Sequence, residues 1–77
     1  MENKNFLIET DDVYSWLQSL DYNFSSSIFC GIISIRFPNK NVFDCVLEEI
    51  CAGKYGDLIC WKSIGRERLV VWHKDLE

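Results

Sequence analysis

The sequence predicts an α+β domain in which two helices pack on one face of a three-stranded, mixed or antiparallel sheet. Apolar residues recur at helical spacing in two segments, and three other segments are β-branched and aromatic runs of strand length. The expected order is helix, strand, helix, strand, strand, with an extra N-terminal strand left open. The length of 77 residues leaves no room for a second core, so residues 1–77 are interpreted as a single domain.

The first helix is expected to begin at Thr10, whose hydroxyl is a common N-cap. Asp11 and Asp12 follow in the first turn, where carboxylates interact favourably with the helix dipole. The segment 5–9 fits either a short strand or an extended arm. The helix is defined by one apolar stripe, which consists of Val13, Trp16, Leu17 and Leu20.

The first strand is expected over residues 28–37, after a serine loop at 25–27. This run is apolar on both faces for part of its length, which indicates a central strand or a covered second face. Gly31 within the run indicates a bulge or the close approach of another segment. Pro38 ends the strand because its ring nitrogen has no hydrogen to donate.

The second helix is expected to be capped by Asn41 and to end at Gly53. Gly53 is predicted to adopt the left-handed conformation that glycine commonly takes after a helix. Residues 55–57 then form a turn. The apolar stripe of this helix comprises Phe43, Val46, Leu47, Ile50 and Cys51.

Two segments of strand length, 58–64 and 68–74, are predicted to form a hairpin around Gly65. A loop of two residues would place Trp61 and Trp72 on the same face. A loop of three residues would shift the pairing by one position and regroup the faces. With the shorter loop, the face that carries both indoles also carries Ile59, Ser63, Arg68 and Val70.

Charge is unevenly distributed in this chain, whose formal net charge is -4. Residues 1–25 carry five carboxylates against Lys4, whereas residues 58–74 carry four cations against Glu67. Each end is therefore suited to a partner of opposite sign. No apolar run approaches the roughly 20 residues of a transmembrane helix. The N-terminus lacks the basic start and long apolar run of a secretory signal, so no membrane association and a cytoplasmic location are expected.

The residues that carry catalysis are sparse. The only histidine, His73, would be a same-face neighbour of Cys60 with the shorter hairpin loop, but a lone histidine at a strand end is usually hydrogen-bonded or solvated. The adjacent carboxylate pairs do not converge on a substrate, and no glycine-rich phosphate loop occurs. We therefore expect no enzyme activity, no catalytic residues, no cofactor and no metal site.

The cysteines are Cys30, Cys45, Cys51 and Cys60, and none forms a Cys-x-x-Cys pair. We interpret them as reduced and buried, as small apolar residues of a cytosolic protein would be. A disulfide between Cys30 and Cys60 is the alternative if their strands pair.

Two surfaces are predicted to bind partners. One is the hairpin face of Trp61, Arg68 and Trp72, whose composition is typical of hot spots in protein recognition, although both indoles would equally serve as core. The other is the acidic start of the first helix, with Glu9, Asp11 and Asp12.

These surfaces favour a small acidic protein-binding module. The leading hypothesis is a stoichiometric inhibitor of a nucleic-acid-handling enzyme, because acidic helices can occupy the basic groove in which such an enzyme binds its nucleic acid. Phages and mobile elements encode inhibitors of this kind, such as anti-defence proteins. The first alternative is a nucleic-acid-binding module that uses the basic, aromatic hairpin, against which the acidity of the whole chain weighs. The second is a homodimer joined through the open sheet face or the edge of the last strand.

Overall fold

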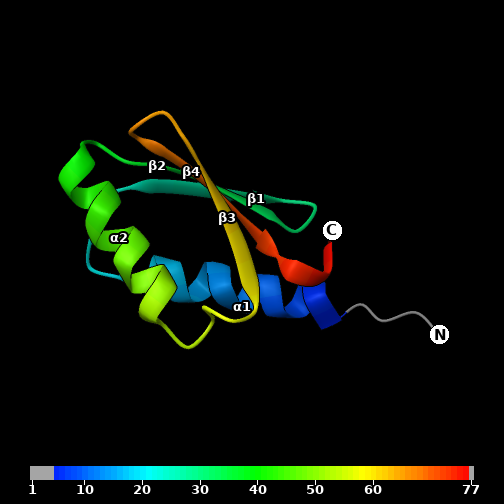
Figure 1. Ribbon diagram of the computed structural model, residues 1–77. Coiled ribbons are helices and arrows are strands. Elements are labelled where there is room, and N and C mark those ends of the chain that lie inside the picture. Colours follow the sequence, from blue (N-terminus) through cyan, green and yellow to red (C-terminus); the bar gives the residue numbers. More distant parts are fainter. Residues whose placement is uncertain (1–4, 77) are drawn as a thin grey trace.

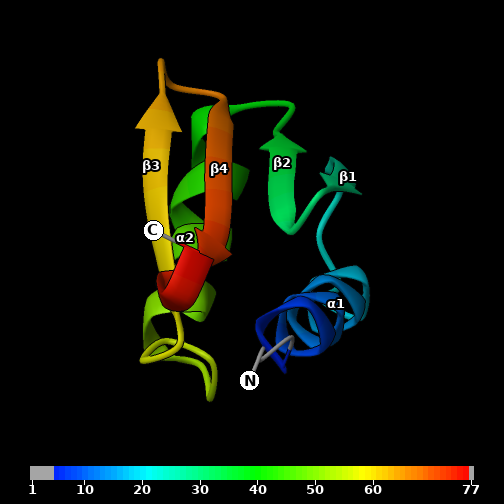
Figure 2. The ribbon, with the colours of Figure 1, turned by 90° about the vertical axis from the view of Figure 1, so that its right-hand side faces the viewer.

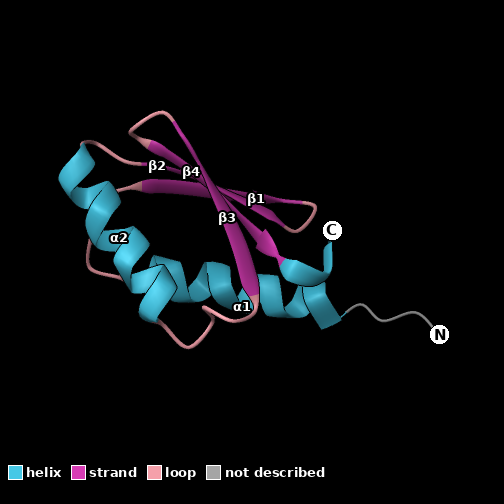
Figure 3. Ribbon diagram, viewed as in Figure 1, coloured by secondary structure: helices cyan, strands magenta, loops and turns pink. Residues whose placement is uncertain are grey.

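The computed structural model describes the backbone of residues 5–76 and the side chains of residues 7–76. The expectations for the N-terminal segment before residue 5, including the charges of Glu2 and Lys4, lie outside the described residues. The α+β class with two helices is confirmed (Figures 1 and 3). The elements, in chain order, are α1 (Asn5–Gln18), β1 (Ser25–Phe29), β2 (Ile32–Arg36), α2 (Lys40–Ala52), β3 (Ile59–Ile64), β4 (Arg68–His73) and the 3₁₀ turn η1 (Lys74–Leu76).

Within residues 5–76 the sheet has four strands in the order β1-β2-β4-β3, and every neighbouring pair is antiparallel. The expectation of three strands is wrong because the run 28–37 is not one strand. The chain reverses at Cys30 and Gly31, whose φ angles of 52° and 80° are the positive values found in tight hairpin turns. The serines at 25–27, expected in a loop, form the first part of β1.

Gly31 is required at this turn for a second reason. It is buried beneath α1, and a Cβ atom added to it would lie 3.2 Å from Cδ2 of Leu7. The close approach expected at Gly31 is therefore present, and the turn of the β1–β2 hairpin packs directly against the first helix.

Both helices lie on one side of the twisted sheet, and neither α1 nor α2 covers the other face (Figures 1 and 2). A single apolar core fills the space between the layers. Its buried members are Val13 and Leu17 from α1, Phe43, Val46 and Ile50 from α2, and Ile33, Ile35, Phe37, Ile59, Leu69 and Val71 from the sheet and its margin.

Helix α1 begins at Asn5, so the predicted N-cap at Thr10 is wrong, as are both alternatives for residues 5–9. Thr10 is buried in the interior of the helix. It lies three and seven residues before Val13 and Leu17, and therefore on the same helix face. Packing of this face against the sheet extends the helix one and a half turns beyond the expected start. No helix of the described residues has the length and apolar character needed to cross a membrane.

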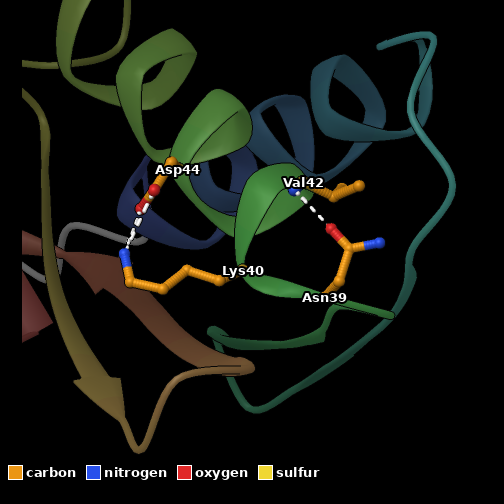
Figure 4. Close-up of polar contacts among 4 residues, drawn as sticks. All are labelled: Asn39, Lys40, Val42 and Asp44. Atoms are coloured by element: carbon orange, nitrogen blue, oxygen red, sulfur yellow. Dashed lines mark hydrogen bonds and ion pairs between the residues drawn. The ribbon is translucent and has the colours of Figure 1, made fainter.

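Helix α2 is capped by Asn39, not by Asn41. The side-chain oxygen of Asn39 accepts a hydrogen bond from the backbone N–H of Val42 at 3.0 Å (Figure 4). One turn of the helix is also bridged by an exposed ion pair of 2.8 Å between Lys40 and Asp44. The capping asparagine is thus the residue directly after Pro38, two positions earlier than predicted.

The end of α2 needs a glycine because of crowding. Gly53 has an extended backbone, with φ −79° and ψ 174°, so the predicted left-handed conformation is wrong. A Cβ atom at this position would lie 2.7 Å from the carbonyl oxygen of Glu49 and 3.0 Å from the indole ring of Trp16. The aromatic ring of α1 therefore packs against the C-terminus of α2.

The β3–β4 loop contains three residues, Gly65 to Glu67, so the pairing is shifted by one position from the two-residue alternative. Trp61 lies opposite Val71, on the side of the helices, whereas Trp72 lies opposite Cys60 on the other side. The last strand, β4, is central, so its edge is not available to a second copy. The edges of the sheet are β1 and β3.

Candidate functional site

The sheet surface that faces away from α1 and α2, here called the open face, is built from three rows of cross-strand neighbours. Because residues directly opposite each other share a face, each row crosses all four strands. The apolar row is Phe29, Ile32, Trp72 and Cys60. The middle row is Ser27, Ser34, Val70 and Lys62, and the arginine row is Ser25, Arg36, Arg68 and Ile64.

The apolar row is uncovered at its β1 end. Phe29 is 79% exposed and Ile32 is 41% exposed, whereas Trp72 and Cys60 are half-buried. At the opposite corner, in the arginine row, Ile64 is 44% exposed. Contiguous exposed apolar groups of this kind mark interaction surfaces more often than singly scattered ones do.

The arginine row places Arg36 directly opposite Arg68 on the two central strands. Neither guanidinium forms an ion pair with a described residue. The two side chains line a shallow hollow of about 320 Å³ together with Ser25, Ser26, Ser27 and Ser34. Like charges directly opposite on neighbouring strands destabilise a sheet, so this arrangement is retained at a cost in stability.

The serines of the hollow differ in direction. Ser25, Ser27 and Ser34 belong to the open face, whereas Ser26 faces α1 and its hydroxyl donates to Oε1 of Gln18 at 3.1 Å. The phenol of Tyr14 also approaches the carbonyl oxygen of Ser26, at 3.4 Å. These contacts fix β1 on α1, so the hydroxyls of Ser25 and Ser27 stand on an anchored strand, and Ser34 stands opposite Ser27 on β2.

The open face carries the cations Arg36, Lys62 and Arg68, and its three rows contain no carboxylate. On the helix side, by contrast, Lys40 is engaged by Asp44, and several carboxylates are exposed. Those on α1, α2 and the turn after α1 include Asp11, Asp12, Asp21, Glu48 and Glu49. The fold thus separates the charge of an acidic chain into a cationic sheet face and an acidic helix layer.

The structure brings together only some of the residues singled out from the sequence. Arg68 and Trp72 share the open face, but Trp61, which is 42% exposed, lies on the opposite face of β3. Of the acidic residues, Asp11 and Asp12 are exposed, whereas Glu9 is engaged by His73. The predicted Trp61–Trp72 surface therefore does not form.

His73 has a structural environment. Its side chain is buried on the helix side of the sheet, and Nε2 lies 2.6 Å from Oε1 of Glu9. Nδ1 accepts a hydrogen bond of 3.0 Å from the backbone N–H of Asp75. Cys60 lies on the other face, opposite Trp72, so the two are not same-face neighbours. The ring joins the end of β4 to α1 and is not directed at a thiol.

The expected burial of the cysteines is wrong for three of them. Cys30, Cys45 and Cys51 are exposed, and Cys60 is half-buried. Cys30 is a free thiol in the β1–β2 turn, so the alternative Cys30–Cys60 disulfide is not formed. Within the described residues, no three His, Cys, Asp or Glu side chains gather into a metal-binding group.

A second hollow lies on the helix layer and is acidic. It measures about 320 Å³ and is lined by Tyr22, Cys45, Glu48, Glu49 and Ala52. The Tyr22 hydroxyl lies 3.5 Å from Oε2 of Glu49. Desolvation, and then the Glu49 carboxylate, raise the pKa of Tyr22 above its ordinary value.

Sequence reasoning missed Arg36, Phe29 and the serines, which complete the open face. A hairpin centred on residues 30 and 31 brings Ser25 opposite Arg36. The signal in the sequence that could have indicated this hairpin was Gly31, in the middle of a ten-residue run.

No protein-family model, curated protein or solved structure matches this chain.

Proposed function

We propose that the protein binds single-stranded nucleic acid on the open face of its sheet. The observation that carries the proposal is the order of the three rows, with exposed aromatic and aliphatic groups at one end and paired arginines at the other. Proteins that bind single strands without strong sequence preference combine an aromatic stacking platform with cations that follow the backbone. An antiparallel sheet with one uncovered face supplies both on a rigid support.

In this proposal, bases stack on Phe29 and Trp72, while phosphates contact Lys62 and the two arginines. Base–aromatic stacking contributes about 1–3 kcal/mol per base and tolerates any sequence. The apolar and arginine rows lie four residues apart along the strands, a spacing of about 13 Å. The backbone of one strand can therefore reach the arginines while its bases rest on the apolar row.

The acidity of the whole chain is compatible with this function because charge is segregated. The cations of the open face stand apart from the carboxylates of α1 and α2. The helix layer would repel the phosphate backbone and the open face attract it, so the field of the protein would orient an approaching strand. Association is then expected to be steeply dependent on salt.

The test uses fluorescence anisotropy with labelled single-stranded DNA and RNA at low salt. Phe29→Ala is the informative variant, because its side chain is 79% exposed and its loss leaves the core intact. We expect it to weaken binding about tenfold, the effect of one lost stacking contact. Trp61→Ala, on the opposite face, is the matched control and should bind as the parent does. Absence of binding at low salt, or equal effects of both variants, would contradict the proposal.

The acidic helix layer favours a second candidate, a stoichiometric protein inhibitor of a nucleic-acid-handling enzyme. The exposed carboxylates Glu48 and Glu49 beside the Tyr22 hollow support it, because such a surface can engage the lysines and arginines of a basic groove. The test measures inhibition of purified nucleases and helicases at equimolar protein. The double variant Glu48→Gln/Glu49→Gln should no longer inhibit the enzyme, whereas Arg36→Gln should inhibit it as the parent does. The reverse pattern would exclude the helix layer as the inhibitory surface.

The homodimer is distinguished from both by light scattering. A second copy on the open face would produce a mass of twice 9.1 kDa that returns to the monomer value in the Phe29→Ala variant. If the protein remains a monomer at high concentration, the open face is not a dimer interface and is available to another partner.

A further inference from the structure

The like-charged pair on the central strands has no explanation in the packing of the protein alone. Arg36 and Arg68 are direct cross-strand neighbours, both exposed, and lack a carboxylate partner among the described residues. Two guanidinium groups held side by side repel each other, and an anion bound between them would remove that repulsion. The pair is therefore arranged for an anion that none of the described residues supplies.

The surroundings of the pair also suit an oxyanion. Ser25 is the cross-strand neighbour of Arg36, and Ser27 and Ser34 form the next row, so three hydroxyls border the same hollow of about 320 Å³. Hydroxyls and guanidinium N–H groups are donors that together satisfy several acceptor oxygens of one group. An adjoining hollow of about 270 Å³, lined by Phe24, Pro38 and others, shares Ser25 and Arg36 with this one and extends it past the start of β1 and the end of β2.

We infer that Arg36, Arg68 and the serine hydroxyls form a subsite for a phosphomonoester, namely the terminal phosphate of a nucleic-acid strand. A phosphomonoester carries about −1.5 to −2 charges at pH 7, which matches two guanidinium groups, whereas an internal phosphodiester carries a single charge. The strand end as the source of this phosphate rests on the proposed function, but recognition of the phosphoryl group does not. Both guanidinium groups of the site lie in the row farthest from the apolar row, so the terminal phosphate anchors a strand whose next bases cross the sheet.

The first experiment compares one oligonucleotide in three forms: 5′-phosphorylated, 3′-phosphorylated and with hydroxyls at both ends. We expect one phosphorylated form to bind about tenfold more tightly than the hydroxyl form, as one added charge-assisted contact would give. Arg36→Gln and Arg68→Gln should abolish this preference. Arg68→Lys keeps the charge but loses the planar fork, so it should retain only part of it.

Lys62→Gln is the matched control on the same face. It should weaken all three forms equally and reduce the slope of log affinity against log salt by about 0.7, because it removes one backbone contact of a single strand. Equal affinity for all three forms, with the arginine variants behaving as Lys62→Gln does, would overturn the subsite and leave nucleic-acid binding intact.

The second experiment uses inorganic phosphate alone, with chloride at matched ionic strength as the reference. Amide NMR signals of residues 25–27, 34–36 and 68 should shift with phosphate in the parent and not in Arg36→Gln. Shifts in this group without any oligonucleotide binding would support the phosphoryl site and refute the proposed function. Identical spectra in phosphate and chloride would overturn the inference.

Discussion

Replacement of His73 by alanine tests how the C-terminal end of the chain is held on the first helix. The imidazole is buried with 1% of the residue exposed, and both ring nitrogens have partners. Because Nδ1 accepts the Asp75 N–H, a ring proton is assigned to Nε2, which donates to Glu9 at 2.6 Å. The ring therefore connects β4 and η1 to α1 across 64 positions of sequence.

Two losses add up in His73→Ala. Removing a large buried side chain costs about 2–5 kcal/mol in a core, and a hydrogen bond to a charged group contributes about 1.5–3 kcal/mol. A destabilisation of about 3.5 kcal/mol, the lower end of this sum, is expected because the edge of the core can partly relax. A domain of 77 residues has a total stability of about 4–12 kcal/mol at the usual value per residue. The melting temperature should therefore fall by about 14–28 °C.

Glu9→Ala isolates the hydrogen bond. It leaves the ring in place, removes the Glu9 carboxylate from Nε2 and should cost about 1–2 kcal/mol. Asp12→Ala, an exposed carboxylate three residues further along α1, is the matched control and should change stability by less than about 0.5 kcal/mol. Urea unfolding followed by circular dichroism measures all three variants. Two results would refute an energetic coupling between Glu9 and His73: equal stability of Glu9→Ala and Asp12→Ala, or a Glu9→Ala/His73→Ala double variant whose loss of stability equals the sum of the two single losses.

Two further pairs of variants test local geometry. Asn39→Ala should destabilise the protein by about 1 kcal/mol because it removes the N-cap of α2. Asn41→Ala, inside the same helix, should be neutral or slightly stabilising because alanine is the better helix former. Equal changes in stability, measured by urea unfolding, would contradict the assignment of Asn39 as the cap. Gly31→Ala and Gly65→Ala both place alanine at positive φ, at a cost of about 1 kcal/mol. Only at Gly31 does the new methyl group approach Leu7, so Gly31→Ala should lower the melting temperature more than Gly65→Ala does. A larger decrease in Gly65→Ala would contradict the contact between the β1–β2 turn and α1.

The helices and the C-terminal hairpin were predictable from the sequence because their signals are periodic. The stripe of α2 placed Phe43, Val46 and Ile50 in the core, where they are found. Thr10 was misread because its hydroxyl suits a cap as well as a helix interior, and packing against the sheet decides between the two. The start of α1 depends on tertiary contact and was not accessible from local pattern.

The candidate site was harder to predict because two turns control it. One residue more in the β3–β4 loop moved Trp61 and Trp72 to opposite faces, since side chains alternate along a strand. The turn at Gly31 folded an apparent single strand into a hairpin and brought Ser25 beside Arg36. Arg68 and Trp72 could be selected from composition, but their neighbours on the open face depend on pairing between strands.

Charge segregation also depends on strand pairing and not on composition. Along the sequence, residues 1–25 have an excess of carboxylates and residues 58–74 an excess of cations. The fold adds Arg36 from the middle of the chain to Lys62 and Arg68, and it directs all three away from the helices. An acidic protein thereby acquires a cationic surface that its net charge does not reveal.

Amide NMR mapping with a single-stranded oligonucleotide shows where on the protein the strand binds, and therefore whether the open face is the binding surface. We expect the chemical-shift changes at low salt to concentrate along the three rows of the sheet, to be largest near Phe29, Trp72 and Arg36, and to fade as salt is raised. Shifts confined to α1 and α2, or a spectrum unchanged by excess oligonucleotide, would contradict it.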